Sequence, residues 1–462
     1  MKQDTICAIA TAQGGAIGMI RVSGPEAIEI VNKLFIPINK GKDLTSQKAY
    51  TLSFGSICQA NEIIDEVLIS VFRAPHSYTG EDSIEIACHG SSYILQQVMQ
   101  LLIQNGCRGA LPGEYTQRAF LNGKMDLSQA EAVADLIASS SSATHRLAMN
   151  QMRGGFSKEL TKLRSQLLNF ASMIELELDF SEEEVEFANR VDLRSLADNI
   201  EQLISRLANS FSVGNAIKNG IPVAIIGETN AGKSTLLNAL LNEEKAIVSD
   251  IHGTTRDVIE DTINIQGITF RFIDTAGIRD THDRIESLGI ERTFQKIDQA
   301  TIVLWMIDST NLQIPFEQLS GSILPHCKNK KLILLFNKAD LTTAVQRDNL
   351  LKLFAGIPSK HLFLSAKSKD NITLLEQLLI KTAALPSIGQ DDIIVTNIRH
   401  YEALTHAHES ISRVQVGLQQ NISGDLLSQD IRECIFHLSD IVGEVSNQDV
   451  LINIFKNFCI GK

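Results

Sequence analysis

The spacing of apolar residues changes along this chain, and each pattern predicts a different kind of structure. In residues 1–121, apolar residues cluster or alternate in short runs between glycines and prolines, as in DTICAIAT, GMIRVSG, DEVLISVF and SIEIACHG. Runs of this length, bounded by turn residues, are typical of β-strands. The pattern therefore predicts an α+β domain over residues 1–121.

Helical spacing begins near residue 122 and continues to about residue 214. Residues 127–180 contain no proline, and Gly154 and Gly155 are their only glycines. The same spacing returns after Pro386, in TNIRHYEALTHAHESISRVQVGL and DLLSQDIRECIFHLSDIVG. Because apolar residues three and four positions apart line one face of a helix, we expect a discontinuous all-helical domain made of residues 122–214 and 384–462.

Between the two helical parts, residues 215–383 alternate apolar strands with segments of helix length. The runs IPVAIIG, ITFRFID, TIVLWMID, KLILLFN and HLFLSA are nearly continuous in apolar residues. Strands of this kind belong to parallel sheets whose two faces are both covered by helices. The sequence thus predicts a multidomain α/β protein, in which a domain with a mostly parallel sheet is inserted into the helical domain.

Composition and charge exclude several classes of protein. With 44% hydrophobic and 21% charged residues, the chain has the make-up of a soluble globular protein, and its apolar runs are too short to span a membrane. A formal charge of −12 and the single Trp305 argue against a protein-wide nucleic-acid surface and against a row of stacking aromatics. Any contact with RNA is therefore expected to be local or shared with a partner.

The seven cysteines are scattered, odd in number and never spaced as C-x-x-C. This usage argues against a disulfide framework and a zinc site, and it fits a reducing cytosol. The first residues show neither the apolar core of a signal peptide nor an Arg-rich transit pattern. We expect a cytoplasmic protein with no membrane association.

The first chemical motif is GETNAGKST at residues 227–235, directly after the strand IPVAIIG. It fits the pattern G-x-x-x-x-G-K-[ST], in which backbone N–H groups of a loop and a helix N-terminus cradle polyphosphate. Lys233 is expected to reach the outer phosphates, and the Ser234 hydroxyl is expected to bind Mg²⁺. The strand before the loop and the helical spacing after it favour a phosphate-binding loop over a chance match.

Three further motifs follow, each at the end of an apolar run: DTAG at 274–277, NKAD at 337–340 and SAK at 365–367. Asp274 is expected in the Mg²⁺ shell and Gly277 near the γ-phosphate. A carboxylate at Asp340 can accept from the two adjacent N–H donors of guanine, which adenine lacks. Each motif alone could be an ordinary turn, but four in this order resemble the translation-factor-related GTPases, whose ligands lie at the carboxyl edge of the sheet.

The loop DIHGTTRDV at 250–258 lies where such domains carry a switch segment, and Thr255 is its candidate Mg²⁺ ligand. The expected GTP-binding residues are Asn230, Ala231, Gly232, Lys233, Ser234, Thr235, Ser249, Asp250, Ile251, His252, Gly253, Thr254, Thr255, Asp274, Thr275, Ala276, Gly277, Asn337, Lys338, Asp340, Ser365, Ala366 and Lys367.

Ile278 follows DTAG where Ras-like GTPases have a water-orienting glutamine. An aliphatic side chain cannot orient water, so hydrolysis needs another group. A monovalent cation beside the phosphates would supply positive charge, and the side-chain oxygen of Asn230 could bind it. The alternative is that Asn230 only braces the loop.

Several longer stretches carry a more specific resemblance: APHSYTGEDSIEIACHG, PGEYTQRAFLNGKMDLSQAEAVADLI, GTTRDVIED, DTAGIRDTHDRIESLGIER and the terminal FCIGK. Together they resemble the MnmE (TrmE) family of tRNA uridine-modification GTPases over essentially the whole chain. The resemblance implies a homodimer that works with the flavoprotein MnmG, which carries FAD. It also implies that the two proteins add a carboxymethylaminomethyl-type group to C5 of the wobble uridine of certain tRNAs, using a tetrahydrofolate one-carbon unit.

The resemblance also implies how hydrolysis is catalysed. The G domains would dimerise across K⁺ held by Asn230, Ser249, Ile251 and Thr254, while Ser234 and Thr255 would hold Mg²⁺. Glu286 would orient the attacking water through a bridging water, although its spacing alone also fits a solvated carboxylate at a helix start. The implied catalytic residues are Glu286, Arg256, Asn230 and Thr254, with the role of Arg256 left open.

For folate, the resemblance implies Arg21, Glu85, Lys124 and Lys462. A carboxylate matches the adjacent donors of a pterin, and cations match glutamyl carboxylates, but each residue alone would pass for an ordinary surface charge. The tail FCIGK is expected to return to the N-terminal domain as an ordered strap, in which Cys459 is either a reactive thiol or a buried structural one.

Some positions depart from the family pattern. Leu111 stands where arginine is usual, Thr229 replaces the common proline of the phosphate-binding loop, and the segment TAQGGAIGMIR is shorter than usual. The main alternative function is a GTP-dependent RNA or ribosome assembly factor, in which the N-terminal domain only docks. Such a protein would hydrolyse GTP without depending on folate or MnmG.

Overall fold

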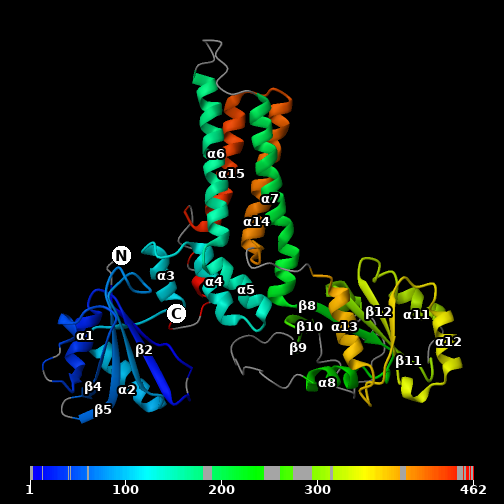
Figure 1. Ribbon diagram of the computed structural model, residues 1–462, viewed down its shortest axis with the longest axis horizontal. Helices are drawn as coiled ribbons and strands as arrows, with labels where there is room; N and C mark the ends of the chain where they lie inside the picture. Colours follow the sequence, from blue (N-terminus) through cyan, green and yellow to red (C-terminus); the bar gives the residue numbers. More distant parts are fainter. Residues whose placement is uncertain are drawn as a thin grey trace. The chain divides into compact units, whose positions relative to one another are not determined.

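Figure 1 shows the computed structural model of the chain. The structure describes residues 4–12, 14–39, 41, 43–59, 62–179, 190–243, 261–273, 294–312, 316–385, 392–444, 451, 454–456, 458 and 461. The chain divides into two compact units. The first unit comprises Met1–Ala138, Ala148–Ser205 and Glu402–Lys462, and the second comprises Ser139–Leu147 and Arg206–Tyr401.

The first unit contains a seven-stranded sheet in the order β3-β4-β5-β6-β2-β1-β7. All neighbouring strands are antiparallel except β1 and β7. Its elements are β1 (Ile6–Ile9), β2 (Ile17–Ser23), α1 (Ala27–Leu34), β3 (Phe35–Pro37), η1 (Leu44–Ser46), β4 (Thr51–Gln59), β5 (Glu62–Phe72), β6 (Ser83–His89), α2 (Ser92–Gln104) and β7 (Arg108–Gly109).

Only one face of this sheet is covered by the two helices α1 and α2. In β5, Val67, Ile69 and Val71 are buried against them, whereas the residues between these three point to the other face. This period of two is what a half-covered antiparallel sheet requires.

The first unit also contains long helices, of which α6 and α15 lie side by side (Figure 1). In α6, Leu163, Leu167, Phe170 and Ile174 are buried at spacings of three and four residues, as expected for a helix with one apolar face. Besides α1 and α2, the described helices that lie wholly or partly in this unit are α3 (Glu114–Leu121), α4 (Leu127–Ala138), α5 (Ser142–Met152), α6 (Gly155–Asp179), α7 (Arg190–Asn219), α14 (Ile398–Gln419) and α15 (Gly424–Val442).

The second unit contains a six-stranded sheet in the order β13-β12-β11-β8-β10-β9. Its strands are parallel except for β9, which runs antiparallel to β10. The elements are β8 (Ile221–Gly227), α8 (Lys233–Glu243), β9 (Asp261–Ile265), β10 (Ile268–Phe272), β11 (Ile302–Asp308), α11 (Phe316–Ile323), β12 (Lys331–Asn337), η3 (Ala339–Leu341), α12 (Ala344–Leu353), β13 (Lys360–Phe363) and α13 (Ile372–Ala383).

Both faces of this second sheet are buried. In the central strand β11, Leu304 and Met306 belong to one apolar core, and Val303 and Trp305 belong to the core on the opposite face. This explains why the strand has no polar alternation. The predicted fold class, a multidomain α/β protein with a mostly parallel sheet in one part, is confirmed.

Helix α7 continues further than the sequence pattern suggested. It runs unbroken over Arg190–Asn219 and ends where Gly220 takes a left-handed φ of +77°. The boundary expected between residues 214 and 215 therefore lies inside a helix, and residues 206–214 pack with the second unit.

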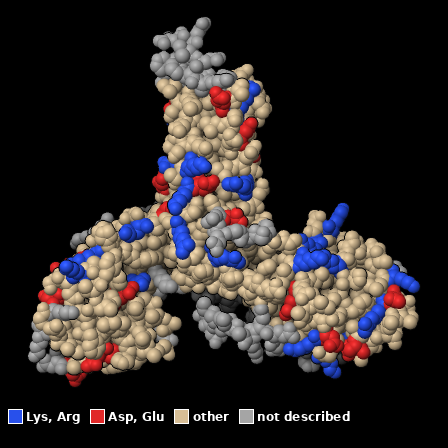
Figure 2. Space-filling model, in the orientation of Figure 1, with Lys and Arg blue, Asp and Glu red and all other residues tan. Residues whose placement is uncertain are grey.

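Both signs of charge occur on the visible face of each unit, as Figure 2 shows. Within the described part of the chain, no helix is long and apolar enough to cross a membrane.

Candidate functional site

The phosphate-binding loop lies between β8 and α8, and its backbone needs glycine at two places. Gly227 has φ +148°, and a Cβ there would lie 2.2 Å from the carbonyl oxygen of Met306 on the neighbouring strand. Gly232 has φ +98°, and a Cβ there would lie 2.3 Å from Nδ2 of Asn337. Between them, Asn230 is also left-handed, with φ +64°. The two glycines therefore allow the tight approach of the loop to the strands beside it.

Lys233, at the start of α8, turns its ammonium group back over this loop. Its Nζ donates to the carbonyls of Gly227 and Glu228, both at 2.8 Å. Burial lowers the pKa of Lys233, and the nearby charge of Lys296 lowers it further, against an opposing effect of Glu228. The loop thus holds a partly buried cation next to the N-terminus of a helix, which suits an anionic ligand such as polyphosphate.

Asn337, the last residue of β12, connects three of the expected GTP-binding segments. It is 3% exposed. Its Nδ2 donates to the carbonyl of Ala231 at 2.7 Å, and its Oδ1 accepts from the backbone N–H of Ala366 at 3.0 Å. One buried amide therefore joins the loop at 227–235 to the segments at 337–340 and 365–367.

The residues after Asn337 form a short, partly exposed turn. Lys338 has φ +60°, and its Nζ lies 2.5 Å from Oδ2 of Asp308 at the end of β11. Burial raises the pKa of Asp308, but hydrogen bonds from Lys338 and Thr310 outweigh this and leave the pKa lowered. Asp340 follows in η3 with its side chain exposed. Its carboxylate is therefore accessible to a base.

Residues 365–367 belong to a turn that is held together by backbone hydrogen bonds. Ser365 and Asp370 exchange two backbone hydrogen bonds, of 3.2 and 3.1 Å. Ser365 and Ala366 are buried, whereas Lys367 is exposed. This turn holds the segment at the end of β13, beside the residues that follow β12.

The other expected GTP-binding, metal-binding and catalytic residues lie outside the described part of the chain, as do three residues of the terminal strap. These residues are Ser249, Asp250, Ile251, His252, Gly253, Thr254, Thr255, Arg256, Asp274, Thr275, Ala276, Gly277, Glu286, Cys459, Ile460 and Lys462. Of the expected metal ligands, the structure describes Asn230 in the loop and Ser234 in the first turn of α8.

The expected folate residues lie in the first unit, and the structure pairs two of them. Arg21 and Glu85 are opposite each other in the register of β2 and β6, and Oε1 of Glu85 accepts from Nε and Nη2 of Arg21 at 3.0 and 2.7 Å. The Nη1 of Arg21 also donates to the carbonyl of Gly461 at 3.3 Å, so the terminal segment contacts β2. Lys124 instead donates to the carbonyl of Pro75 at 2.8 Å.

Two tyrosines that the sequence analysis missed flank Arg21. The guanidinium carbon lies 5.8 Å from the ring centroid of Tyr78 and 5.7 Å from that of Tyr115. Burial raises the pKa of both phenols, so both remain protonated, and Tyr115 donates to the backbone carbonyl of Arg21 at 2.7 Å. Both lie within stretches that carry the family resemblance, but no spacing along the chain places them beside Arg21.

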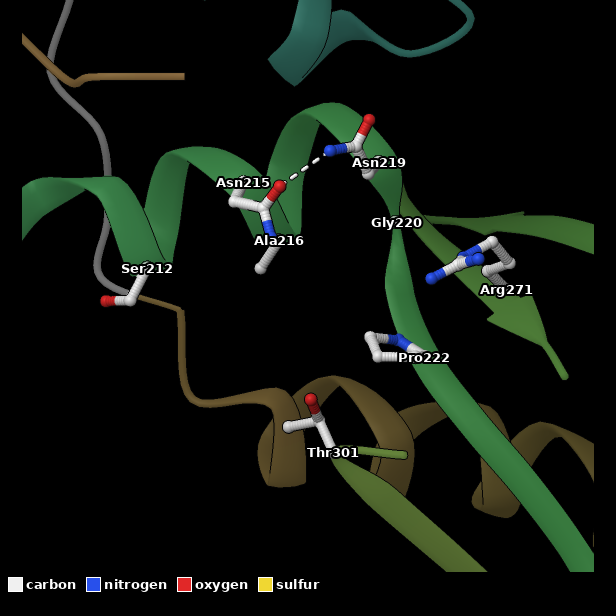
Figure 3. A pocket seen from close by; sticks show the side chains of 8 residues that line it. All are labelled: Ser212, Asn215, Ala216, Asn219, Gly220, Pro222, Arg271 and Thr301. Carbon is white, nitrogen blue, oxygen red and sulfur yellow. Dashed lines mark hydrogen bonds between the residues drawn. The ribbon is translucent and has the colours of Figure 1, made fainter. Parts of the chain in front are cut away.

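A separate pocket of about 560 Å³ opens at the opposite edge of the parallel sheet. Figure 3 shows Asn215 and Asn219 on α7, hydrogen-bonded to each other, with Arg271 nearby on β10. Pro222 and Thr301 place it where β8 and β11 begin, not where they end. None of the expected site residues lines this pocket, so it is distinct from the nucleotide segments.

Two family models match the chain, one over its N-terminal domain and one over nearly all of the rest. The model described as the MnmE helical domain matches residues 127–459. The model described as the GTP-binding protein TrmE N-terminus matches residues 5–124.

Similar proteins match over the full length. A tRNA modification GTPase MnmE of Bacteroides thetaiotaomicron is 72% identical over 465 residues, covering 100% of both chains. The corresponding protein of Phocaeicola vulgatus is 68% identical and covers 100% of this chain and 99% of its own. That of Flavobacterium johnsoniae is 54% identical and covers 100% of both chains. With these matches and an assembled phosphate-binding loop, the chain belongs to the MnmE family of tRNA modification GTPases.

Proposed function

We propose that this GTPase binds GTP at the carboxyl edge of its parallel sheet, with the phosphates on residues 227–235 and the guanine on Asp340 and residues 365–367. The observation that carries the proposal is the buried side chain of Asn337, which ties all three segments together. In this arrangement, Ser234 would hold Mg²⁺ together with Thr255, and Mg²⁺ would neutralise charge on the phosphates. Lys233 would exchange its bonds to loop carbonyls for phosphate oxygens.

We further propose that K⁺ assists hydrolysis, held by Asn230 with Ser249, Ile251 and Thr254. Asn230 is exposed on the loop, and its amide oxygen is a carbonyl oxygen, the kind of ligand that can replace the hydration shell of K⁺. Glu286 would orient the attacking water, and Arg256 would belong to the same switch region. A cation at this position would offset the charge that develops during phosphoryl transfer.

Single-turnover GTP hydrolysis in matched KCl and NaCl tests the K⁺ proposal, with Asn230→Ala as the variant. We expect potassium to accelerate hydrolysis and Asn230→Ala to abolish the difference between the two salts. Asn349→Ala, an exposed substitution on α12, is the matched control. Equal rates in the two salts for the unmodified protein would remove the role assigned to Asn230.

The first unit is proposed to bind a tetrahydrofolate derivative beside Arg21 and Glu85, with Lys124 and Lys462 meeting its glutamyl carboxylates. The support is chemical: a half-buried carboxylate lies next to a guanidinium flanked by two aromatic rings, which suits a flat ring with adjacent N–H donors. Glu85→Gln should weaken the binding of a reduced folate, measured by calorimetry, while leaving the affinity for GDP unchanged.

These parts together would modify the wobble uridine of tRNA in the cytoplasm, in a complex with the flavoprotein MnmG carrying FAD. The protein is proposed to act as a homodimer through the face of the first sheet opposite α1 and α2, where β4 and β5 leave that face exposed. Leu52, Phe54 and Leu68 lie exposed there, on the face that also carries Arg21 and Glu85. Transfer RNA from a strain lacking the gene should lose the modified uridine, and the intact gene should restore it.

A further inference from the structure

We infer that Arg347 is a positioning residue for guanine recognition, which fixes the turn carrying Asp340 against the end of β13. Arg347 lies on α12, outside the four nucleotide motifs. The inference rests on the proposed role of Asp340 as the group that binds the base. It concerns the geometry of that carboxylate, because Arg347 itself would not touch the nucleotide.

The guanidinium group of Arg347 holds both ends of the turn that contains Asp340. Its Nη2 donates to the carbonyl of Ala339 at 2.7 Å, and its Nε donates to Oγ1 of Thr342 at 3.1 Å. The Thr342 hydroxyl in turn donates to the same Ala339 carbonyl at 2.9 Å. Asp340 therefore lies between two residues that a single planar group joins.

The same guanidinium group also contacts the neighbouring strand. Its central carbon lies 5.7 Å from the ring centroid of Phe363, the last residue of β13. Phe363 stacks on Phe336, with ring centroids 4.7 Å apart, and Phe336 directly precedes Asn337. The cation–π contact thus links the turn to the strand that leads into residues 365–367.

The carboxylate of Asp340 depends on this backbone for its direction. Within the described residues, no hydrogen bond or ion pair holds the Asp340 side chain, which is exposed. Its position is set by η3, and η3 is held by the Ala339 N–H bonded to the Leu364 carbonyl at 3.1 Å and by Arg347. Loss of Arg347 would free one side of the turn and lower the time that Asp340 spends in the orientation for guanine.

Arginine is specifically suited to this position. It donates from two nitrogens in one plane while its face rests on an aromatic ring, whereas the single ammonium of lysine cannot reproduce both. Helix α12 does not need Arg347 to form, because Thr343 and Gln346 make a capping box at its start. A substitution at Arg347 should therefore loosen the turn and leave the helix intact.

The test compares the affinities of fluorescent GDP, IDP and XDP for the full-length protein and for Arg347→Met and Arg347→Lys. Hypoxanthine lacks the 2-amino group that Asp340 would bind, so the ratio of GDP to IDP affinity reports the carboxylate's position. We expect Arg347→Met to weaken GDP binding about tenfold and to lower that ratio, with Arg347→Lys in between. The kcat at saturating GTP should change little while KM rises.

Two further variants separate the possible failures. Lys352→Met, an exposed cation at the far end of α12, should match the unmodified protein. Asp340→Asn should favour XDP over GDP, and if it does not, the proposed base site itself is wrong. If Asp340→Asn switches preference but both Arg347 variants keep the original GDP to IDP ratio, the positioning role is overturned. Should Arg347→Met fail to fold, the ratio for Arg347→Lys decides alone.

Discussion

The side-chain amide of Asn337 donates to the backbone carbonyl of Ala231 at 2.7 Å, across 106 positions of sequence. Ala231 lies in the phosphate-binding loop, and Asn337 lies at the end of the strand that leads to Asp340. The bond therefore couples the phosphate half of the proposed GTP site to the base half. Since the amide is buried, neither partner can turn to water instead.

Asn337→Ala should damage both halves of the site at once. It would leave the Ala231 carbonyl and the Ala366 N–H without their buried partner, at a cost of about 1–3 kcal/mol each. We expect weaker GDP binding and a less stable second unit, measured by fluorescent-nucleotide titration and thermal unfolding. Asn349→Ala, on the exposed surface of α12, is the control. An unchanged GDP affinity would show that the bond is not needed to shape the site.

Gly232→Ala should abolish nucleotide binding, although it adds only one methyl group. A methyl group would lie 2.3 Å from the Asn337 amide on a backbone with φ +98°, so the loop must move. Gly356→Ala is a matched control, because its added methyl meets nothing within 4 Å. Titration with fluorescent GDP distinguishes the two, and equal affinity of both variants would contradict the geometry described for the loop.

A network of opposite charges in the first unit should make its stability depend on pH. Arg118 pairs with Asp4, Glu81 and Glu114, while Arg108 pairs with Asp4 and Glu114. The hydrogen bond from Arg108, helped by Arg118 and opposed by burial, lowers the pKa of Asp4. Burial raises the pKa of Glu114, but hydrogen bonds from Arg108, the Leu111 N–H and Arg118 outweigh it, and the pKa is lowered.

A carboxylate whose pKa is lowered by folding stabilises the native state at any pH above its pKa in the unfolded chain. This stabilisation is lost as the pH falls through the pKa of the folded state. Because Asp and Glu in unfolded chains have pKa values of about 4, the free energy of urea unfolding should be lower at about pH 3 than at about pH 7. Glu114→Gln should cost about 2 kcal/mol at about pH 7, because hydrogen bonds to charged groups are lost, and it should reduce the pH dependence. A variant with the same pH dependence as the unmodified protein would remove Glu114 from this effect.

The exposed part of the first sheet over β4 and β5, on the face opposite α1 and α2, should determine the oligomeric state. Phe54 and Leu68 are paired across β4 and β5, and they are 49% and 40% exposed. We expect Phe54→Glu to convert a dimer into a monomer, because a charge would have to be buried without a partner. Light scattering measures the mass. Ile103→Glu, on the exposed side of α2, is the control, and a dimer that survives Phe54→Glu would place the interface elsewhere.

The sequence alone determined the features that lie within one continuous segment. Buried strands, long helices and the motifs at 227–235, 337–340 and 365–367 could be predicted, because strand burial and phosphate-loop geometry depend on neighbouring residues. The end of α7 was harder to predict: the sequence pattern placed the end of this helical part at about residue 214, whereas the helix continues to Asn219 and ends before Gly220.

Only the tertiary structure decided which distant residues meet. Arg21 faces Glu85 because of the register between β2 and β6, and a shift of one residue would send the two side chains to opposite faces. Lys338 with Asp308 and Arg347 with Phe363 are also brought together only by the fold. These contacts depend on how strands align and helices pack, which is set by the whole core and which no spacing within a single motif records.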